Sequence, residues 1–93
     1  MGKLENHYKK EIETISELME AVIADNSVPR NIRKAVEEAK NKIGANSEDI
    51  GVSISSAIYV LDDISNDINM PSHTRTEIWT IISELENLKE KIK

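Results

Sequence analysis

Hydrophobic residues recur every three or four positions in four segments of this 93-residue chain, the spacing that places them on one face of an α-helix. The first segment runs from about Leu4 to Ala24, and charged side chains occupy its opposite face. The second runs from about Pro29 to Ile43, the third from about Ser47 to Ile64, and the fourth from about Pro71 to Ile92. We therefore predict an all-α fold with four helices.

The predicted helix boundaries depend on proline, glycine and short polar residues. Proline suits a first helical turn, where its missing N–H has no intrahelical partner, so the second helix should open near Pro29 with Ser27 or Val28 as its cap. Gly44 should end that helix in a left-handed conformation. Ser47 should cap the third helix, and Pro71 should open the fourth.

The chain also repeats itself with a shift of 42 residues, which superimposes residues 8–36 on residues 50–78 in matching chemical register. The matched pairs include Asp25 and Asp67, Val28 and Met70, Pro29 and Pro71, Arg33 and Arg75, and Val36 and Ile78. Paired-helix repeats have periods of about this length. We predict a single domain over residues 1–93, a four-helix up-and-down bundle built from two similar hairpins at about 4–43 and 47–92. A solenoid-like stack of the two units is the alternative.

An aspartate and an arginine recur eight residues apart across each proline turn, as Asp25 with Arg33 and as Asp67 with Arg75. Such a pair could bind a ligand, or it could form a salt bridge or a helix-start contact that fixes the turn. Because repetition of a turn is first a solution to folding, we interpret Asp25, Pro29, Asp67 and Pro71 as turn-fixing residues.

Charge and composition narrow the classes of function. The net charge is −5, which disfavours non-specific attraction to nucleic acid or an anionic membrane. The chain has no cysteine and no apolar run of the roughly 20 residues that span a bilayer. We expect a cytoplasmic protein without a membrane partner.

No arrangement of residues indicates catalysis, and we expect no catalytic residue, cofactor or metal. The two histidines, His7 and His73, lack the Glu-x-x-His spacing of metal sites in helical bundles. Ser72, His73 and Asp67 have no nucleophile elbow around them. Nothing indicates a small-molecule substrate, so we do not expect an enzyme.

One basic cluster stands out on this acidic chain. Arg30 and Arg33 open the second helix, and Arg75 with His73 occupies the equivalent start of the fourth. Phosphate groups of RNA could bind such a patch. An RNA-associated accessory protein is therefore the alternative function, although Trp79 alone offers an aromatic ring for base stacking.

Trp79 and Tyr59 each lie one position off the hydrophobic stripe of their helix. Each could cover a seam between helices or anchor a binding interface, where aromatic residues are enriched. Val52 and Val60 are further apolar residues outside the predicted core. These positions favour a protein–protein interaction module, bound to a protein partner or to further copies of itself.

The segments Ser27–Arg33, Asp63–Asp67 and Met70–Pro71, with His73-Thr74-Arg75 and Ile78-Trp79, resemble a group of small archaeal proteins, Uncharacterised Protein Family 0147. The resemblance covers about residues 8–88. It implies an all-helical, bundle-like domain in an archaeal cytoplasm, and it brings no established activity.

Overall fold

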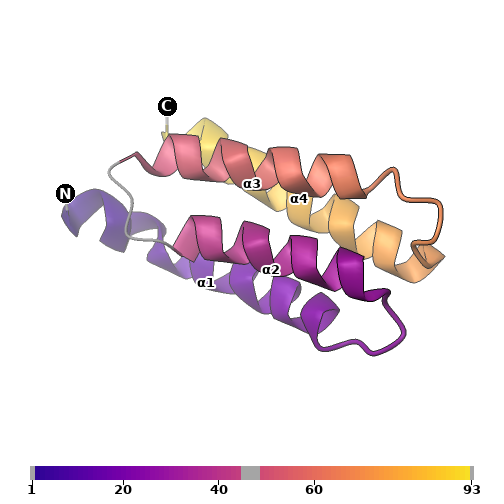
Figure 1. Ribbon diagram of the computed structural model, residues 1–93. Coiled ribbons are helices and arrows are strands. Elements are labelled where there is room, and N and C mark those ends of the chain that lie inside the picture. The colour runs from indigo at the N-terminus through magenta and orange to yellow at the C-terminus, as the bar shows by residue number, and fades with distance from the viewer. Residues whose placement is uncertain (1, 45–48, 93) are drawn as a thin grey trace.

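The computed structural model describes residues 2–44 and 49–92, with side chains described from Tyr8 onward, and all of its regular elements there are helices. They are α1 (Gly2–Ile23), α2 (Arg30–Gly44), α3 (Ile50–Ile64) and α4 (Ser72–Ile92). Neighbouring helices run antiparallel, and the turns α1–α2 and α3–α4 lie at the same end (Figure 1). The four predicted helices are confirmed, each within a few residues of its expected bounds.

The helices form a closed ring rather than an open stack. α1 packs on α2 and α4, and α3 packs on α2 and α4, while no Cα atoms of the diagonal pairs approach within 8 Å in the described residues. The contact between the first and last helices distinguishes a bundle from a solenoid-like stack. The four-helix bundle is therefore confirmed, about 40 Å long and 20 by 17 Å across.

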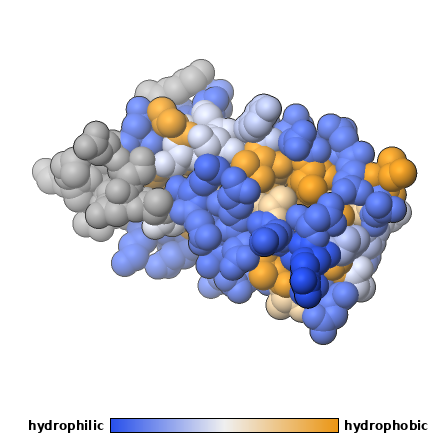
Figure 2. Space-filling model, in the orientation of Figure 1, coloured by the Kyte–Doolittle hydropathy of each residue, from blue (hydrophilic) through white to orange (hydrophobic). Residues whose placement is uncertain are grey.

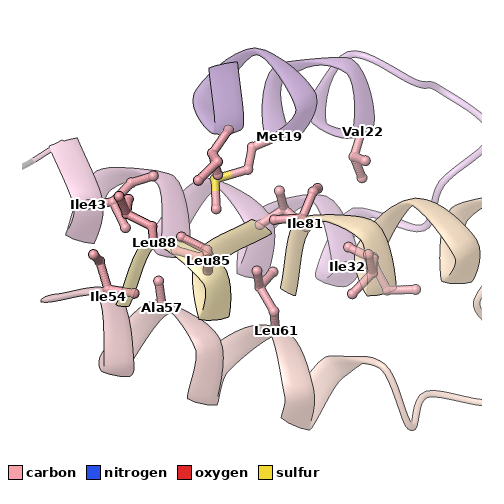
Figure 3. Packing of buried hydrophobic residues seen from close by; sticks show 14 of the residues in the cluster. Met19, Val22, Ile32, Ile43, Ile54, Ala57, Leu61, Ile81, Leu85 and Leu88 are labelled. Carbon is pink, nitrogen blue, oxygen red and sulfur yellow. The ribbon is translucent and has the colours of Figure 1, made fainter. Parts of the chain in front are cut away.

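The core is aliphatic and follows the predicted stripes of all four helices. The buried side chains of the four helices point into the space between them (Figure 3). The buried hydrophobic residues are Tyr8, Ile15, Met19, Val22, Val28, Ile32, Val36, Ala39, Ile43, Ile54, Ala57, Leu61, Met70, Ile78, Ile81, Leu85 and Leu88. Leu18 is an exception, since more than a third of its surface remains exposed although it belongs to the α1 stripe.

The predicted cap of α2, Ser27 or Val28, is wrong, because the helix begins only at Arg30. The Ser27 N–H and hydroxyl both donate to the Asp25 carboxylate, at 2.9 and 2.6 Å. The Pro29 carbonyl accepts the first helical N–H groups, from Ile32 and Arg33. α3 is capped by Asp49, whose carboxylate accepts from the Val52 N–H at 3.2 Å. The predicted cap Ser47 lies outside the described residues.

Gly44 also differs from the prediction. It is the last residue of α2, and no glycine in the described part of the chain has a positive φ. Gly44 therefore does not adopt the left-handed conformation that we expected to end the helix.

One buried polar group has no partner. Thr74 is fully buried near the start of α4, and its hydroxyl finds no hydrogen-bond acceptor or donor among the described residues. The equivalent position in the first hairpin is Ile32, a core aliphatic. The repeat therefore preserves burial at this position but not apolar chemistry.

Candidate functional site

The two interhelical turns have the same backbone hydrogen bonds at equivalent positions. The Val28 N–H donates to the Asp25 carbonyl at 3.1 Å, and the Met70 N–H donates to the Asp67 carbonyl at 3.2 Å. Each aspartate also accepts, through Oδ1, the N–H two residues on, from Ser27 and from Asn69 respectively. This side-chain turn is one that aspartate forms readily.

The recurring arginines stabilise the turns through the main chain and not through the aspartate carboxylates. Arg33 Nε donates to the Val28 carbonyl at 3.0 Å, and Arg75 Nη2 donates to the Asp67 carbonyl at 2.9 Å. Arg75 therefore contacts the aspartate eight residues before it, through that residue's carbonyl, whereas Arg33 contacts Val28, five residues before it. Each guanidinium group thus donates a hydrogen bond to a backbone carbonyl of an interhelical turn.

The turns also hold each other. His73 Nε2 lies 3.3 Å from Asp25 Oδ2, and Asn31 Nδ2 donates to Asp67 Oδ2 at 3.0 Å. Asn31 and His73 are equivalent under the 42-residue shift, as are the two aspartates. Each hairpin therefore offers its helix-start residue to the aspartate of the other, which relates the hairpins by an approximate two-fold axis along the bundle.

Asp25 accepts hydrogen bonds both from its own turn and from the opposite hairpin. Hydrogen bonds from the Ser27 hydroxyl and backbone N–H, and then from His73, lower the pKa of Asp25 below its ordinary value. The carboxylate is thereby kept charged as a structural acceptor. No group of three or more acidic, histidine or cysteine side chains that could hold a metal ion occurs among the described residues, and the side chain of His7 lies outside them.

The proposed basic patch is smaller than the sequence suggested. Arg33 and Arg75 bond to the turns, and Lys40, farther along α2, pairs with Glu20 at 2.8 Å. Arg30 is exposed at the start of α2. The structure thus brings Arg30, Arg33, His73 and Arg75 to one end of the bundle, but two of them, Arg33 and Arg75, donate hydrogen bonds to carbonyls of the chain itself.

Exposed hydrophobic side chains concentrate on the second hairpin. The exposed fraction is 59% for Val52, 76% for Tyr59, 92% for Ile68 and 57% for Trp79. More than half of the surface of Trp79 is therefore exposed, and only the remainder can cover a seam between helices. Ile68, at the tip of the α3–α4 turn, was missed by the sequence analysis, because an isolated apolar residue in a loop breaks no periodicity.

The first hairpin provides an internal comparison for these four positions. At each equivalent position it carries an exposed polar or charged residue. The pairs are Val52 and Lys10, Tyr59 and Glu17, Ile68 and Asn26, and Trp79 and Glu37. Equivalent positions thus carry a polar or charged side chain on the first hairpin and a large apolar side chain on the second.

The distinction is visible on the surface around α3. Figure 2 shows orange and pale atoms, with blue ones among them, along the upper part of the molecule where α3 runs, above a mostly blue surface over α2. The outward residues of α3 line an open groove of about 740 Å³ with the end of α2 and the last turns of α4. We call Val52, Ser55, Ser56, Tyr59 and Val60 the α3 face.

Among the described residues, every helix is too short or too polar to span a membrane.

A family model described as Uncharacterised protein family (UPF0147) matches residues 1–88. A UPF0147 protein of Methanothermobacter thermautotrophicus is 49% identical over 76 residues, which cover 82% of this chain and 74% of that protein. A UPF0147 protein of Methanocaldococcus jannaschii is 51% identical over 72 residues, which cover 77% of each.

Two crystal structures share the fold. One, of a UPF0147 protein from Thermoplasma acidophilum, aligns with a TM-score of 0.81 and 32% identity, over 86% of this chain and 94% of that one. Another, of a protein described as having unknown function, aligns with a TM-score of 0.79 and 49% identity, over 82% and 86%. These comparisons identify relatives without supplying an activity.

Proposed function

Because the chain belongs to the archaeal family UPF0147, whose name assigns no activity, we propose its function from its surface: it is a non-enzymatic module that binds another protein through its second hairpin. The observation that carries this proposal is the contrast between equivalent positions of the two hairpins. Tyr59 and Trp79 are exposed where the first hairpin has Glu17 and Glu37. The cytoplasm is the proposed setting.

The fold does not require these exposed apolar groups. The first hairpin has the same turn and the same buried stripe with polar or charged residues at the corresponding sites, so this hairpin fold accommodates such residues there. Large aromatic side chains on a surface cost solubility, and they are concentrated at the centres of protein interfaces. A binding role explains their presence.

RNA binding receives no comparable support. Arg33 and Arg75 donate to turn carbonyls, and the whole chain carries a charge of −5. A phosphate-binding surface needs several free cationic groups, since each neutralised phosphate adds to the affinity. We therefore do not propose the RNA alternative.

The test is site-specific photo-cross-linking in the cells that make the protein. A photoreactive phenylalanine analogue replaces Tyr59 or Trp79, and the matched controls carry it at Glu17 or Glu37. We expect a cross-linked protein, identified by mass spectrometry, from positions 59 and 79 only. Equal cross-linking from both hairpins, or none from the second, contradicts the proposed function.

A further inference from the structure

The α3 face is a continuous uncharged strip. Its residues are spaced by three and four along the helix, and no Asp, Glu, Lys or Arg occurs between Ile50 and Leu61. Val52 and Tyr59, seven residues apart, mark the ends of two helical turns, and Ser55 and Ser56 lie between them. The strip thus has bulky groups at its ends and small ones in its middle.

This shape suits a helix lying along the groove. The small serines let a second helix approach closely, while Val52 and Tyr59 contact it one turn to either side. A second open pocket, between α3 and α4, shares Ser55 and Lys89 with the groove and is lined in addition by Ile58 and Glu86. Helices that dock in this way present an apolar stripe at the same three- and four-residue spacing.

The rim of the groove, taken with the residues just beyond its lining, is predominantly acidic. Asp62 and Asp63 follow Tyr59 by three and four residues, which brings them to the same side of α3. Glu38 borders the groove on α2, and Glu86 borders the neighbouring pocket between α3 and α4. All four of these acidic residues are exposed.

Within the groove itself Lys42 and Lys89 match Glu38 and Asp49 in number, so the excess of acidic groups around the strip comes from Asp62, Asp63 and Glu86 beside it. A second copy of the chain would bring its own acidic rim against this one, in a molecule that already carries −5. A partner with cationic flanks would meet complementary charge instead.

We infer that the α3 face binds an amphipathic helix of another protein, one whose apolar stripe is flanked by lysine and arginine. The inference rests on the proposed function and specifies the partner's chemistry. The apolar stripe packs on Val52 and Tyr59, and the cationic flanks face Asp62, Asp63 and Glu86. Salt weakens the binding, because part of the attraction is between exposed charges.

The test uses two synthetic helical peptides of about 18 residues, long enough to span the strip. Both carry the same leucine stripe, flanked by lysines in one peptide and by glutamates in the other. Titration into the ¹⁵N-labelled full chain should shift amide signals of α3 with the lysine peptide. Its affinity should fall at least about 10-fold in Tyr59→Glu, as for an interface anchor, and remain unchanged in the first-hairpin control Glu17→Gln.

Binding of the glutamate peptide as tightly as the lysine peptide overturns the inference. So does an absence of α3 shifts with the lysine peptide up to about 1 mM, the weakest affinity that counts as binding here. Sedimentation that reveals a dimer abolished by Tyr59→Glu also overturns it, since a second copy would then occupy the strip. The proposed function survives each of these results if positions 59 and 79 still cross-link another protein.

Discussion

The imidazole Nε2 of His73 lies 3.3 Å from the carboxylate Oδ2 of Asp25, joining the start of α4 to the turn that follows α1. The equivalent contact, from Asn31 to Asp67, joins the start of α2 to the turn that follows α3. The two contacts are related by the repeat, so each turn is fixed both by its own backbone and by the opposite hairpin.

Asp25 should give the fold a dependence on acidic pH. Its pKa is lowered in the folded protein by Ser27 and then His73, so the charged form is favoured in the folded state. The resulting stability is present above the pKa of the unfolded chain and is lost as pH falls through the lowered pKa. Urea unfolding followed by circular dichroism should therefore show a weaker acid dependence in Asp25→Asn than in the wild type.

Glu13→Gln, at an exposed position of α1, is the control for this experiment and should retain the wild-type acid dependence. An Asp25→Asn variant whose unfolding varies with pH as the wild type does would show that the Ser27 and His73 contacts do not perturb this carboxylate.

Thr74→Val should stabilise the protein. The Thr74 hydroxyl is fully buried and has no hydrogen-bond partner among the described residues, and valine has nearly the same shape without the polar atom. Relieving such a group is worth about 1–3 kcal/mol, which raises the melting temperature of a domain this small by several degrees. Thr80→Val is the control, because Thr80 is exposed and its hydroxyl donates to the Thr76 carbonyl. A melting temperature that falls in Thr74→Val refutes this account.

Arg75→Met should destabilise the protein by about 1–2 kcal/mol, because it removes a charge-assisted hydrogen bond to the Asp67 carbonyl while keeping an apolar stem. Arg30→Met, at an exposed position of the same end of the bundle, should change stability by less than about 0.5 kcal/mol. Chemical denaturation measures both. Equal losses in the two variants would mean that positive charge, and not the turn contact, stabilises this end.

Giving α3 the outer residues of α1 should leave the fold intact. The double variant Val52→Lys with Tyr59→Glu places on α3 the residues found at the equivalent exposed positions, and its stability should stay within about 0.5 kcal/mol of wild type. Leu61→Ala, on the buried side of the same helix, should lose about 2–5 kcal/mol. A large loss in the double variant would show that the α3 face contributes to folding.

The sequence predicts the bundle because its apolar stripes are local and repeated. Ile12, Met19 and Val22 fall on Ile54, Leu61 and Ile64, and all six side chains are buried in the core or packed against it. The 42-residue shift likewise places Asp25 and Pro29 on Asp67 and Pro71, and the two turns prove to have matching hydrogen bonds.

Contacts between distant segments could not be predicted in the same way. His73 and Asp25 are 48 residues apart, and only the assembled bundle brings them together. The role of Ser27 was also hidden, because its place before α2 does not reveal that its N–H and hydroxyl both close the turn onto Asp25. The exposure of Tyr59 and Trp79 depends on how much of the surface of α3 and of α4 is covered by the neighbouring helices. The spacing of apolar residues along the sequence does not determine that width.

The contrast between the outer surfaces of α1 and α3 gives the molecule a well-wetted flank and a sparingly wetted one on opposite corners of the bundle. A protein with two such sides is expected to approach a less polar surface with its α3 side. On a hydrophobic-interaction column it would be retained by the α3 flank, with the α1 flank still facing the buffer.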